Sequence, residues 1–245
     1  MRKTENNLFL ALVFRTSASI IVLLGLLSSL EVFRGSIVYT QLLFFTFWAN
    51  FFTFVFFILL TVKSAISLKK DGKEGNCFFY SKIYSSLVVY MFIVMFAFWI
   101  GIAPFVENTH ELWRFSNFAT HVTNPIVLLV DYTLFSRGGT IGKRQPLLYL
   151  IFPTVYAVVT TIMGFSGVEF VSPYFDYPHS FPYPFMDWSV LGGLTILTIL
   201  ATVAVFVATG YALYAIDKRR VQIKHAQNKI PITGEPLDDF IETAN

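Results

Sequence analysis

Residues 118–136 read Phe-Ala-Thr-His-Val-Thr-Asn-Pro-Ile-Val-Leu-Leu-Val-Asp-Tyr-Thr-Leu-Phe-Ser. The stretch is apolar enough to lie in a lipid bilayer, yet it contains His121, Asn124 and Asp131. An ionisable side chain within a span costs roughly 2.5–3.5 kcal/mol on insertion scales, so its presence indicates a site or a buried pair. At about 100° per residue, the three polar side chains share one side of a helix. Because lipid cannot hydrogen-bond to them, we expect this side to face other protein.

The rest of the chain has the composition of a multi-pass membrane protein. Hydrophobic residues make up 55% of the 245 residues, and charged residues make up 13%, against roughly 25% in a typical soluble domain. Six apolar blocks are each long enough to cross ~30 Å of hydrocarbon. They lie at about 8–30, 41–62, 83–105, 118–136, 147–166 and 189–216. We therefore predict an all-α integral membrane protein, with one bundle of six transmembrane helices in residues 1–216 and a mobile tail at 217–245.

The distribution of Lys and Arg predicts the orientation of this bundle. The loops at 63–82 and 137–146 and the start of the tail are rich in Lys and Arg. The three alternate loops, at 31–40, 106–117 and 167–188, contain two Arg and no Lys. Positive loops remain in the cytoplasm, so both termini and the tail are expected there.

Several partners and cofactors are not supported by the sequence. The net charge of +3 is too small to indicate nucleic acid, and the positive residues cluster beside the spans. Cys77 is the only cysteine, which excludes an intrachain disulfide and a cysteine-rich zinc site. His110-Glu111 is followed by no second histidine at zinc-site spacing, and no phosphate-binding glycine motif is present. We expect no metal and no cofactor, and the sequence does not predict the oligomeric state.

Depth in the membrane pairs Thr46 with His121. The predicted spans 41–62 and 118–136 both run from outside to inside, and both residues lie about 5–8 Å below the outer boundary at ~1.5 Å per residue. Neutral imidazole is the usual base that activates a hydroxyl near pH 7. The two side chains are a candidate nucleophile and base, although the same depth also fits a simple hydrogen bond between helices.

Arg15 and Asp131 form a second pair of matched depth, near the cytoplasmic ends of their spans. An unpaired charge there would be costly, so an intramembrane ion pair with a structural role is the favoured interpretation. A proton or ion relay, or extension of Arg15 towards the cytoplasmic surface, is the alternative.

The outer segment 167–188 combines four prolines with Tyr, Phe and Trp. The prolines exclude a regular helix, and the aromatic rings suit the headgroup region. This segment is either an interfacial cap on the bundle or a lid over a pocket open to lipid.

Three motifs resemble the androgen-induced-protein-like family of multi-pass membrane proteins. They are Phe44-Phe45-Thr46-Phe47, the Asn117…His121…Pro125…Asp131 pattern, and Tyr183-Pro184-Phe185. Characterised animal members are threonine hydrolases that cleave fatty acid esters of hydroxy fatty acids, and the resemblance implies that Thr46 and His121 are the catalytic pair. Pro125 and Asp131 after the histidine are similar to the microbial branch, which implies a bacterial plasma membrane.

The leading hypothesis is therefore a membrane-embedded esterase of the serine-hydrolase type, with Thr46 as nucleophile and His121 as base. Its substrate would be a membrane lipid or fatty acyl ester that enters from the outer leaflet. Asn50, Asn117 and Asn124 are candidate oxyanion donors or supports of the histidine. The lid or pocket cap would include Tyr183, Pro184, Phe185 and Asp187. The alternative hypothesis is a non-catalytic lipid-binding protein or small-solute carrier whose polar residues serve packing or transport.

Overall fold

The chain folds into a bundle of long helices. The structure is a computed structural model, and it describes residues 7–106, 108–175 and 178–229. Within these residues the regular secondary structure is helical, with turns and loops between the helices and one isolated β-bridge between Phe170 and His179. Five helical stretches are long and apolar enough to cross a membrane, which marks the chain as an integral membrane protein. They are Leu8–Ser29, Phe45–Asp71, Ser81–Phe105, Gln145–Phe165 and Trp188–Ile223.

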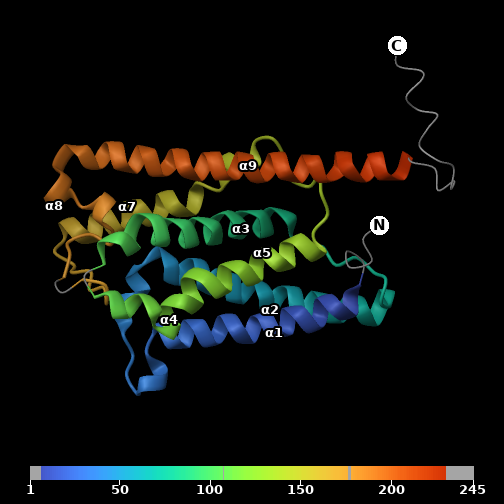
Figure 1. Cartoon of the computed structure of the whole chain (residues 1–245), viewed down its shortest axis with the longest axis horizontal. Helices are drawn as coiled ribbons and strands as arrows, with labels where there is room; N and C mark the ends of the chain where they lie inside the picture. The colour runs from blue at the N-terminus through green and yellow to red at the C-terminus, as the bar shows by residue number, and fades with distance from the viewer. Residues whose placement is uncertain (1–6, 107, 176–177, 230–245) are drawn as a thin grey trace, which may run out of the picture.

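Four helices form the packed core. They are α1 (Leu8–Ser29), α2 (Phe45–Asp71), α3 (Ser81–Phe96) and α5 (Asn124–Phe135), and Figure 1 shows them side by side along the long axis of the molecule. Val22, Phe57, Met91 and Leu128 meet in the core, one from each helix. The opposite faces of these helices remain apolar and exposed, as expected where lipid surrounds a bundle.

Two further helices lie along one side of this core. α9 (Thr195–Lys229) extends over the whole length of the bundle. α7 (Ile151–Phe165) lies beside it at the end where the chain passes from α7 to α8 (Trp188–Leu191) (Figure 1). The short α6 (Gln145–Leu148) leads into α7. α7 buries only Thr160 and Gly164 of its own residues, so this helix is loosely attached to the core.

The predicted span at 118–136 is a continuous but irregular helical run. It consists of α4 (Phe115–Phe118), the π-helix η6 (Ala119–Thr123) and α5. Proline explains the irregularity, because Pro125 has no N–H for the carbonyl of His121 and its ring would clash with that carbonyl in a regular helix. A widened π-turn avoids this clash. The same reasoning applies to the π-helix η3 (Ala97–Ile102) and the short η4 (Ala103–Phe105), which contains Pro104.

Several predicted boundaries differ from the structure. The second span begins at Phe45, not at residue 41, because Tyr39–Leu43 forms a separate 3-10 helix, η2; this span also continues to Asp71. α9 continues through residues 217–229, which the sequence assigned to the tail. Contacts hold the start of this extension, since Asp217 accepts a hydrogen bond from Ile141 N at 3.0 Å and Arg220 donates to Ser136 Oγ at 2.6 Å. The remainder of the predicted tail, 230–245, lies outside the described residues.

Six of the short elements gather at one end of the bundle. They are η1 (Val32–Arg34), η2, η5 (Thr109–Trp113), η7 (Pro184–Met186), α8 (Trp188–Leu191) and η8 (Gly192–Leu194). α1 begins and α9 ends at the opposite end (Figure 1). Thr46 and His121 therefore both lie near the loop-rich end, where α2 begins and α4 passes into η6.

Candidate active site

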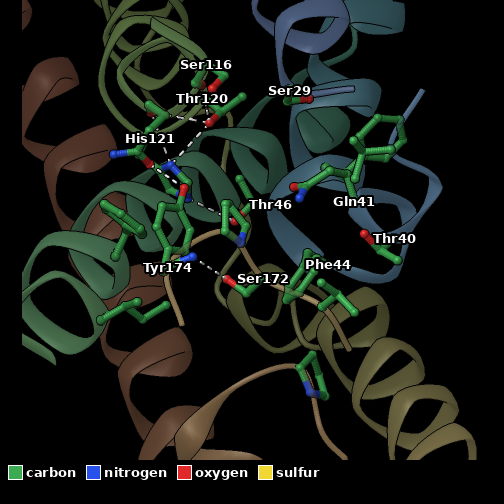
Figure 2. Close-up of a pocket in the computed structure, with 18 of the residues that line it drawn as sticks. Ser29, Thr40, Gln41, Phe44, Thr46, Ser116, Thr120, His121, Ser172 and Tyr174 are labelled. Atoms are coloured by element: carbon green, nitrogen blue, oxygen red, sulfur yellow. Dashed lines mark hydrogen bonds between the residues drawn. The ribbon is translucent and has the colours of Figure 1, made fainter. Parts of the chain in front are cut away.

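Thr46 and His121 are in contact. Thr46 is the second residue of α2, and its Oγ1 lies 3.3 Å from Nε2 of His121 in η6. His121 is only 6% exposed. Figure 2 shows both side chains at the wall of a cavity. The two residues that depth matching had paired are thus within hydrogen-bond distance of each other.

The second ring nitrogen of His121 determines the direction of this hydrogen bond. Nδ1 lies 3.2 Å from the carbonyl oxygen of Asn117 and 3.2 Å from Oγ1 of Thr120. A carbonyl oxygen can only accept, so Nδ1 carries the ring proton of the neutral imidazole. Nε2 is then an acceptor and faces the hydroxyl of Thr46. This is the arrangement that general-base activation of a hydroxyl requires.

The π-turn and an aromatic neighbour hold the imidazole ring. Phe98, from η3, stacks on His121 with the ring centroids 3.9 Å apart and the planes inclined by 25°. Phe98 is 2% exposed. Two π-helices, each associated with a proline, therefore bring these two rings face to face. π-turns inside helices are frequent at functional sites.

Asn50 connects α2 to η6 behind the pair. Its Nδ2 donates to the carbonyls of Thr46 at 2.8 Å and Thr120 at 3.2 Å, so both amide hydrogens are used. Asn124 Nδ2 donates in turn to Asn50 Oδ1 at 2.8 Å. α1 packs against Asn124 at Gly25. A side chain at this position would place its Cβ only 2.8 Å from Asn124 Nδ2, so the close approach requires glycine. Asn50 and Asn124 hold the two helices in register, and Asn50 has no hydrogen left for an oxyanion.

Asn117 also supports the histidine. Its carbonyl accepts from His121 Nδ1, while its side chain donates to the carbonyl of Leu112 at 2.8 Å. The Tyr174 hydroxyl donates to Asn117 Oδ1 at 2.7 Å. The sequence left two roles open for Asn117, an oxyanion donor or a support of the histidine. These contacts favour support of the histidine.

Tyr183 lies at the N-terminus of α2 beside Thr46. Its hydroxyl accepts a hydrogen bond from the backbone N–H of Phe45 at 3.0 Å and also interacts with Thr46. Burial raises the pKa of Tyr183, and hydrogen bonds from its neighbours oppose this only in part. The phenol therefore remains protonated at neutral pH, with a proton that it can donate towards the site.

Two cavities meet at the pair. The first has a volume of about 280 Å³ and opens between the loops, with Gln41, Ser116 and Ser172 among its lining residues. The second, about 410 Å³, lies between α3, α7 and α9, with Val94, Ala157 and Phe206 among its lining residues. Thr46, Phe98, Ile102, His121 and Tyr183 line both.

The other residues of the predicted lid have different roles. Pro184 lines the first cavity and Phe185 lines the second. Asp187 lines neither cavity; it caps α8, where its carboxylate accepts from Ser189 N at 2.9 Å and Val190 N at 3.2 Å. The segment thus places aromatic residues over the site, while its acidic residue has a local structural function.

Arg15 and Asp131 are together at the other end of the bundle. Arg15 Nε lies 3.0 Å from Asp131 Oδ1 and Nη2 lies 3.3 Å from Oδ2, with both side chains fully buried. Arg15 also donates to Ser64 Oγ at 2.8 Å, and the Tyr84 hydroxyl donates to Asp131. The carboxylate is therefore hydrogen-bonded from α1 and α3, and its arginine partner is also bonded to α2, which suits a structural pair.

Sequence reasoning missed Phe98, Thr120 and Tyr174. Phe98 is one of 28 phenylalanines, and only its position six residues before Pro104 distinguishes it. Tyr174 lies in a loop with no periodicity, so its contact with Asn117 has no sequence signal.

Among the described residues, no group of three or more His, Cys, Asp or Glu side chains is arranged to hold a metal ion.

Comparison with protein-family models, with curated proteins and with solved structures found no match to this chain. The function proposed for it therefore rests on its own residues and their geometry. That geometry provides a hydroxyl, a correctly oriented base, a buried phenol and an adjoining apolar cavity, which are the parts needed for acyl transfer.

Proposed function

We propose that this protein is a membrane-embedded hydrolase of lipophilic acyl esters, with Thr46 as nucleophile and His121 as general base. One observation carries the proposal: Thr46 Oγ1 lies 3.3 Å from His121 Nε2, and the other ring nitrogen, Nδ1, is hydrogen-bonded to the Asn117 carbonyl. An adjoining apolar cavity of about 410 Å³ gives an acyl chain a place beside this pair. The resemblance of the three sequence motifs to threonine hydrolases supports the same assignment.

The reaction has two acyl-transfer steps. Thr46 Oγ1 attacks the ester carbonyl carbon while His121 Nε2 takes the hydroxyl proton. The tetrahedral adduct then collapses, the bond to the alcohol oxygen breaks, and His121 gives the proton to that oxygen. Water next attacks the carbonyl carbon of the acyl-Thr46 ester while His121 Nε2 takes a proton from the water, and the bond to Thr46 Oγ1 breaks as His121 gives this proton to the departing Thr46 oxygen. One ester and one water become one acid and one alcohol.

Charge on the tetrahedral adduct would develop close to the N-terminus of α2. The cap residue Phe44 offers this terminus no side-chain hydrogen bond and the Phe45 N–H donates to the Tyr183 hydroxyl, so the positive end of the helix dipole lies beside both Thr46 and Tyr183. The protonated Tyr183 hydroxyl is a side-chain donor at the same terminus. Together they would stabilise the oxyanion.

We further propose the placement of the protein in its membrane. The run Phe115–Phe135 acts as a sixth span beside the five long helices, both ends of the chain are cytoplasmic, and the membrane is a bacterial plasma membrane. The positive loops at 63–82 and 137–146 support the orientation. Thr46 and His121 then lie near the outer leaflet, where lipid reaches the apolar cavity past the loosely attached α7.

Labelling with a fluorophosphonate tests the nucleophile directly. Wild-type protein in detergent micelles should be labelled, and Thr46→Ala and His121→Ala should each lose at least about 100-fold in labelling rate. Thr46→Ser should keep the reaction. Thr53→Val is the matched control, because the Thr53 hydroxyl is buried in the same helix and donates only to the Ala49 carbonyl at 2.8 Å.

The labelling result also separates the hydrolase from the non-catalytic alternative, a lipid-binding protein or small-solute carrier. Equal labelling of wild type and Thr46→Ala, with both proteins folded by circular dichroism, would exclude Thr46 as the nucleophile. Binding of a fatty acyl ester without turnover would indicate a lipid-binding protein. The geometry does not favour a carrier, since the intramembrane charges of Arg15 and Asp131 are hydrogen-bonded within the bundle.

A further inference from the structure

The first turn of α2 carries half of the proposed catalytic machinery. Its Phe45 N–H bonds to the Tyr183 hydroxyl, and Thr46 Oγ1 faces Nε2 of His121. A displacement of this turn by about 1 Å would change the geometry of proton transfer and attack, and such displacements are costly for rate. The contacts that hold the turn therefore bear directly on catalysis. This inference rests on the hydrolase function proposed above.

Two backbone carbonyls fall between the hydrogen bonds of η2 and those of α2. At the end of η2, the carbonyl of Gln41 accepts from Phe44 N at 3.2 Å, and at the start of α2 the carbonyl of Phe44 accepts from Phe47 N at 3.2 Å. The carbonyls of Leu42 and Leu43 lie between these two bonds, as happens where one helix ends before the next begins. In an apolar environment each of them needs a donor, because an unsatisfied buried carbonyl is costly.

Aromatic side chains supply both donors. Trp48 Nε1 donates to the carbonyl of Leu42 at 2.8 Å, and the Tyr156 hydroxyl donates to the carbonyl of Leu43 at 2.9 Å. Trp48 belongs to α2 itself, whereas Tyr156 belongs to α7. The hydrogen bond of Tyr156 therefore ties the start of α2 to a different helix.

The rings of α7 pack on the same turn. Phe152 stacks on Phe45 with the ring centroids 5.0 Å apart, and the Tyr156 ring lies edge-on to Phe45 at 5.4 Å. The Tyr156 ring also lies 6.4 Å from that of Tyr183. α7 is in addition one wall of the apolar cavity, which Tyr156 lines. The helix that would enclose the acyl chain is thus also the helix that supports the nucleophile.

We infer that Tyr156 is a positioning residue of the proposed hydrolase. Its hydroxyl holds the Leu43 carbonyl, this contact fixes the first turn of α2, and Thr46 consequently stays within reach of His121 Nε2. Entry of a lipid past α7 displaces this helix and stretches the same hydrogen bond. The nucleophile therefore returns to its aligned position when α7 closes over the acyl chain.

Tyr156→Phe tests this role, because it removes the hydroxyl and keeps the ring beside Phe45. With the purified variant in lipid nanodiscs, kcat for p-nitrophenyl decanoate should fall about 10-fold or more, while KM changes less than about 2-fold. A merely structural hydroxyl would lower the temperature of unfolding and leave kcat of the folded protein unchanged. Wild-type kcat in folded Tyr156→Phe would overturn the inference.

Thr160→Val is the matched control on α7. The Thr160 hydroxyl is buried one turn beyond Tyr156, and it donates within its own helix, to the carbonyls of Tyr156 at 2.8 Å and Ala157 at 3.3 Å. This variant should keep kcat within about 2-fold of the wild type. An equal loss of kcat in Thr160→Val and Tyr156→Phe would show a general disturbance of α7 and would overturn the assignment of Tyr156.

Trp48→Phe gives an independent measurement on the same turn. It leaves the Leu42 carbonyl without its donor, so kcat and the rate of fluorophosphonate labelling should both fall, as in Tyr156→Phe. A loss in Trp48→Phe without any loss in Tyr156→Phe would mean that α2 is held from within, and the inference would fail. If the wild type neither cleaves p-nitrophenyl decanoate nor reacts with the fluorophosphonate, the proposed hydrolase function itself fails.

Discussion

The hydrogen bonds of His121 show how single residues determine the chemistry at the candidate site. Asn117 supplies a carbonyl to Nδ1, and this leaves Nε2 as the acceptor that faces Thr46. Phe98 covers one face of the imidazole ring. A histidine with the same sequence position but a free Nδ1 would have no preferred tautomer, and its hydrogen bond to Thr46 could run in either direction.

Tyr183→Phe tests the proposed oxyanion donor. The change removes the Tyr183 hydroxyl, which lies beside the start of α2, and it leaves the contacts of the ring with Phe44 and Phe185 in place. Removal of one donor should lower kcat for p-nitrophenyl decanoate by roughly 100-fold with little change in KM. A variant with unchanged kcat would exclude this role.

The pH dependence of the wild type gives a second measurement on Tyr183. Burial raises the pKa of this phenol above its ordinary value of 10.0. The neutral, donating form therefore persists through the alkaline range, so kcat should show no loss from tyrosine ionisation below about pH 10. A decline in kcat near pH 9 that disappears in Tyr183→Phe would contradict this assignment.

At the scale of elements, two prolines shape the helices that carry the site. Pro125 widens the turn at 119–123, and Pro104 follows the corresponding turn at 97–102. Each π-turn changes the direction in which its side chains point. His121 and Phe98 consequently meet, although they come from different spans.

Pro125→Ala tests the contribution of the π-turn. Alanine restores an N–H that can bond to the His121 carbonyl, so the turn can relax into regular α-helix and rotate the imidazole ring away from Thr46. We expect fluorophosphonate labelling to fall at least about 10-fold with helical content unchanged by circular dichroism. Wild-type labelling in this variant would show that the π-turn does not position His121.

At the scale of the whole molecule, the polar residues form two separate sites along one helical run. His121 and Asp131 are ten positions apart, which corresponds to about 15 Å along a helix axis. The site at the loop-rich end adjoins two cavities. The site at the other end is fully buried and joins α1, α2, α3 and α5 through Arg15, Ser64, Tyr84 and Asp131.

Asp131→Ala tests the structural role of the second site. It leaves Arg15 buried without its carboxylate, and the free energy of unfolding should decrease by roughly 3–5 kcal/mol. Replacing both partners, as in Arg15→Met with Asp131→Leu, should recover most of this loss. Unfolding in a denaturing detergent measures both effects. A stable Asp131→Ala protein with impaired solute flux would instead indicate a transport role.

The sequence by itself determined the membrane character of the chain and most of its long helices. Long apolar blocks separated by charged loops can satisfy their backbone hydrogen bonds in lipid only as helices. Depth along these helices was enough to pair Thr46 with His121 and Arg15 with Asp131, since the rise per residue is fixed. It was not enough to place the start of α2, where Tyr39–Leu43 forms its own short helix.

Only the tertiary structure decided what surrounds these pairs. Phe98 reaches His121 from η3, and Tyr174 and Tyr183 reach Asn117 and the start of α2 from the outer segment 167–188. The Thr40 hydroxyl has no hydrogen-bond partner, which follows from how the loops pack. Such contacts depend on the rotation of each helix and on irregular turns, and neither is encoded in local periodicity. Hydrophobic pattern fixes which segments enter the membrane, whereas side-chain packing between distant segments fixes the cavities and the hydrogen bonds of the site.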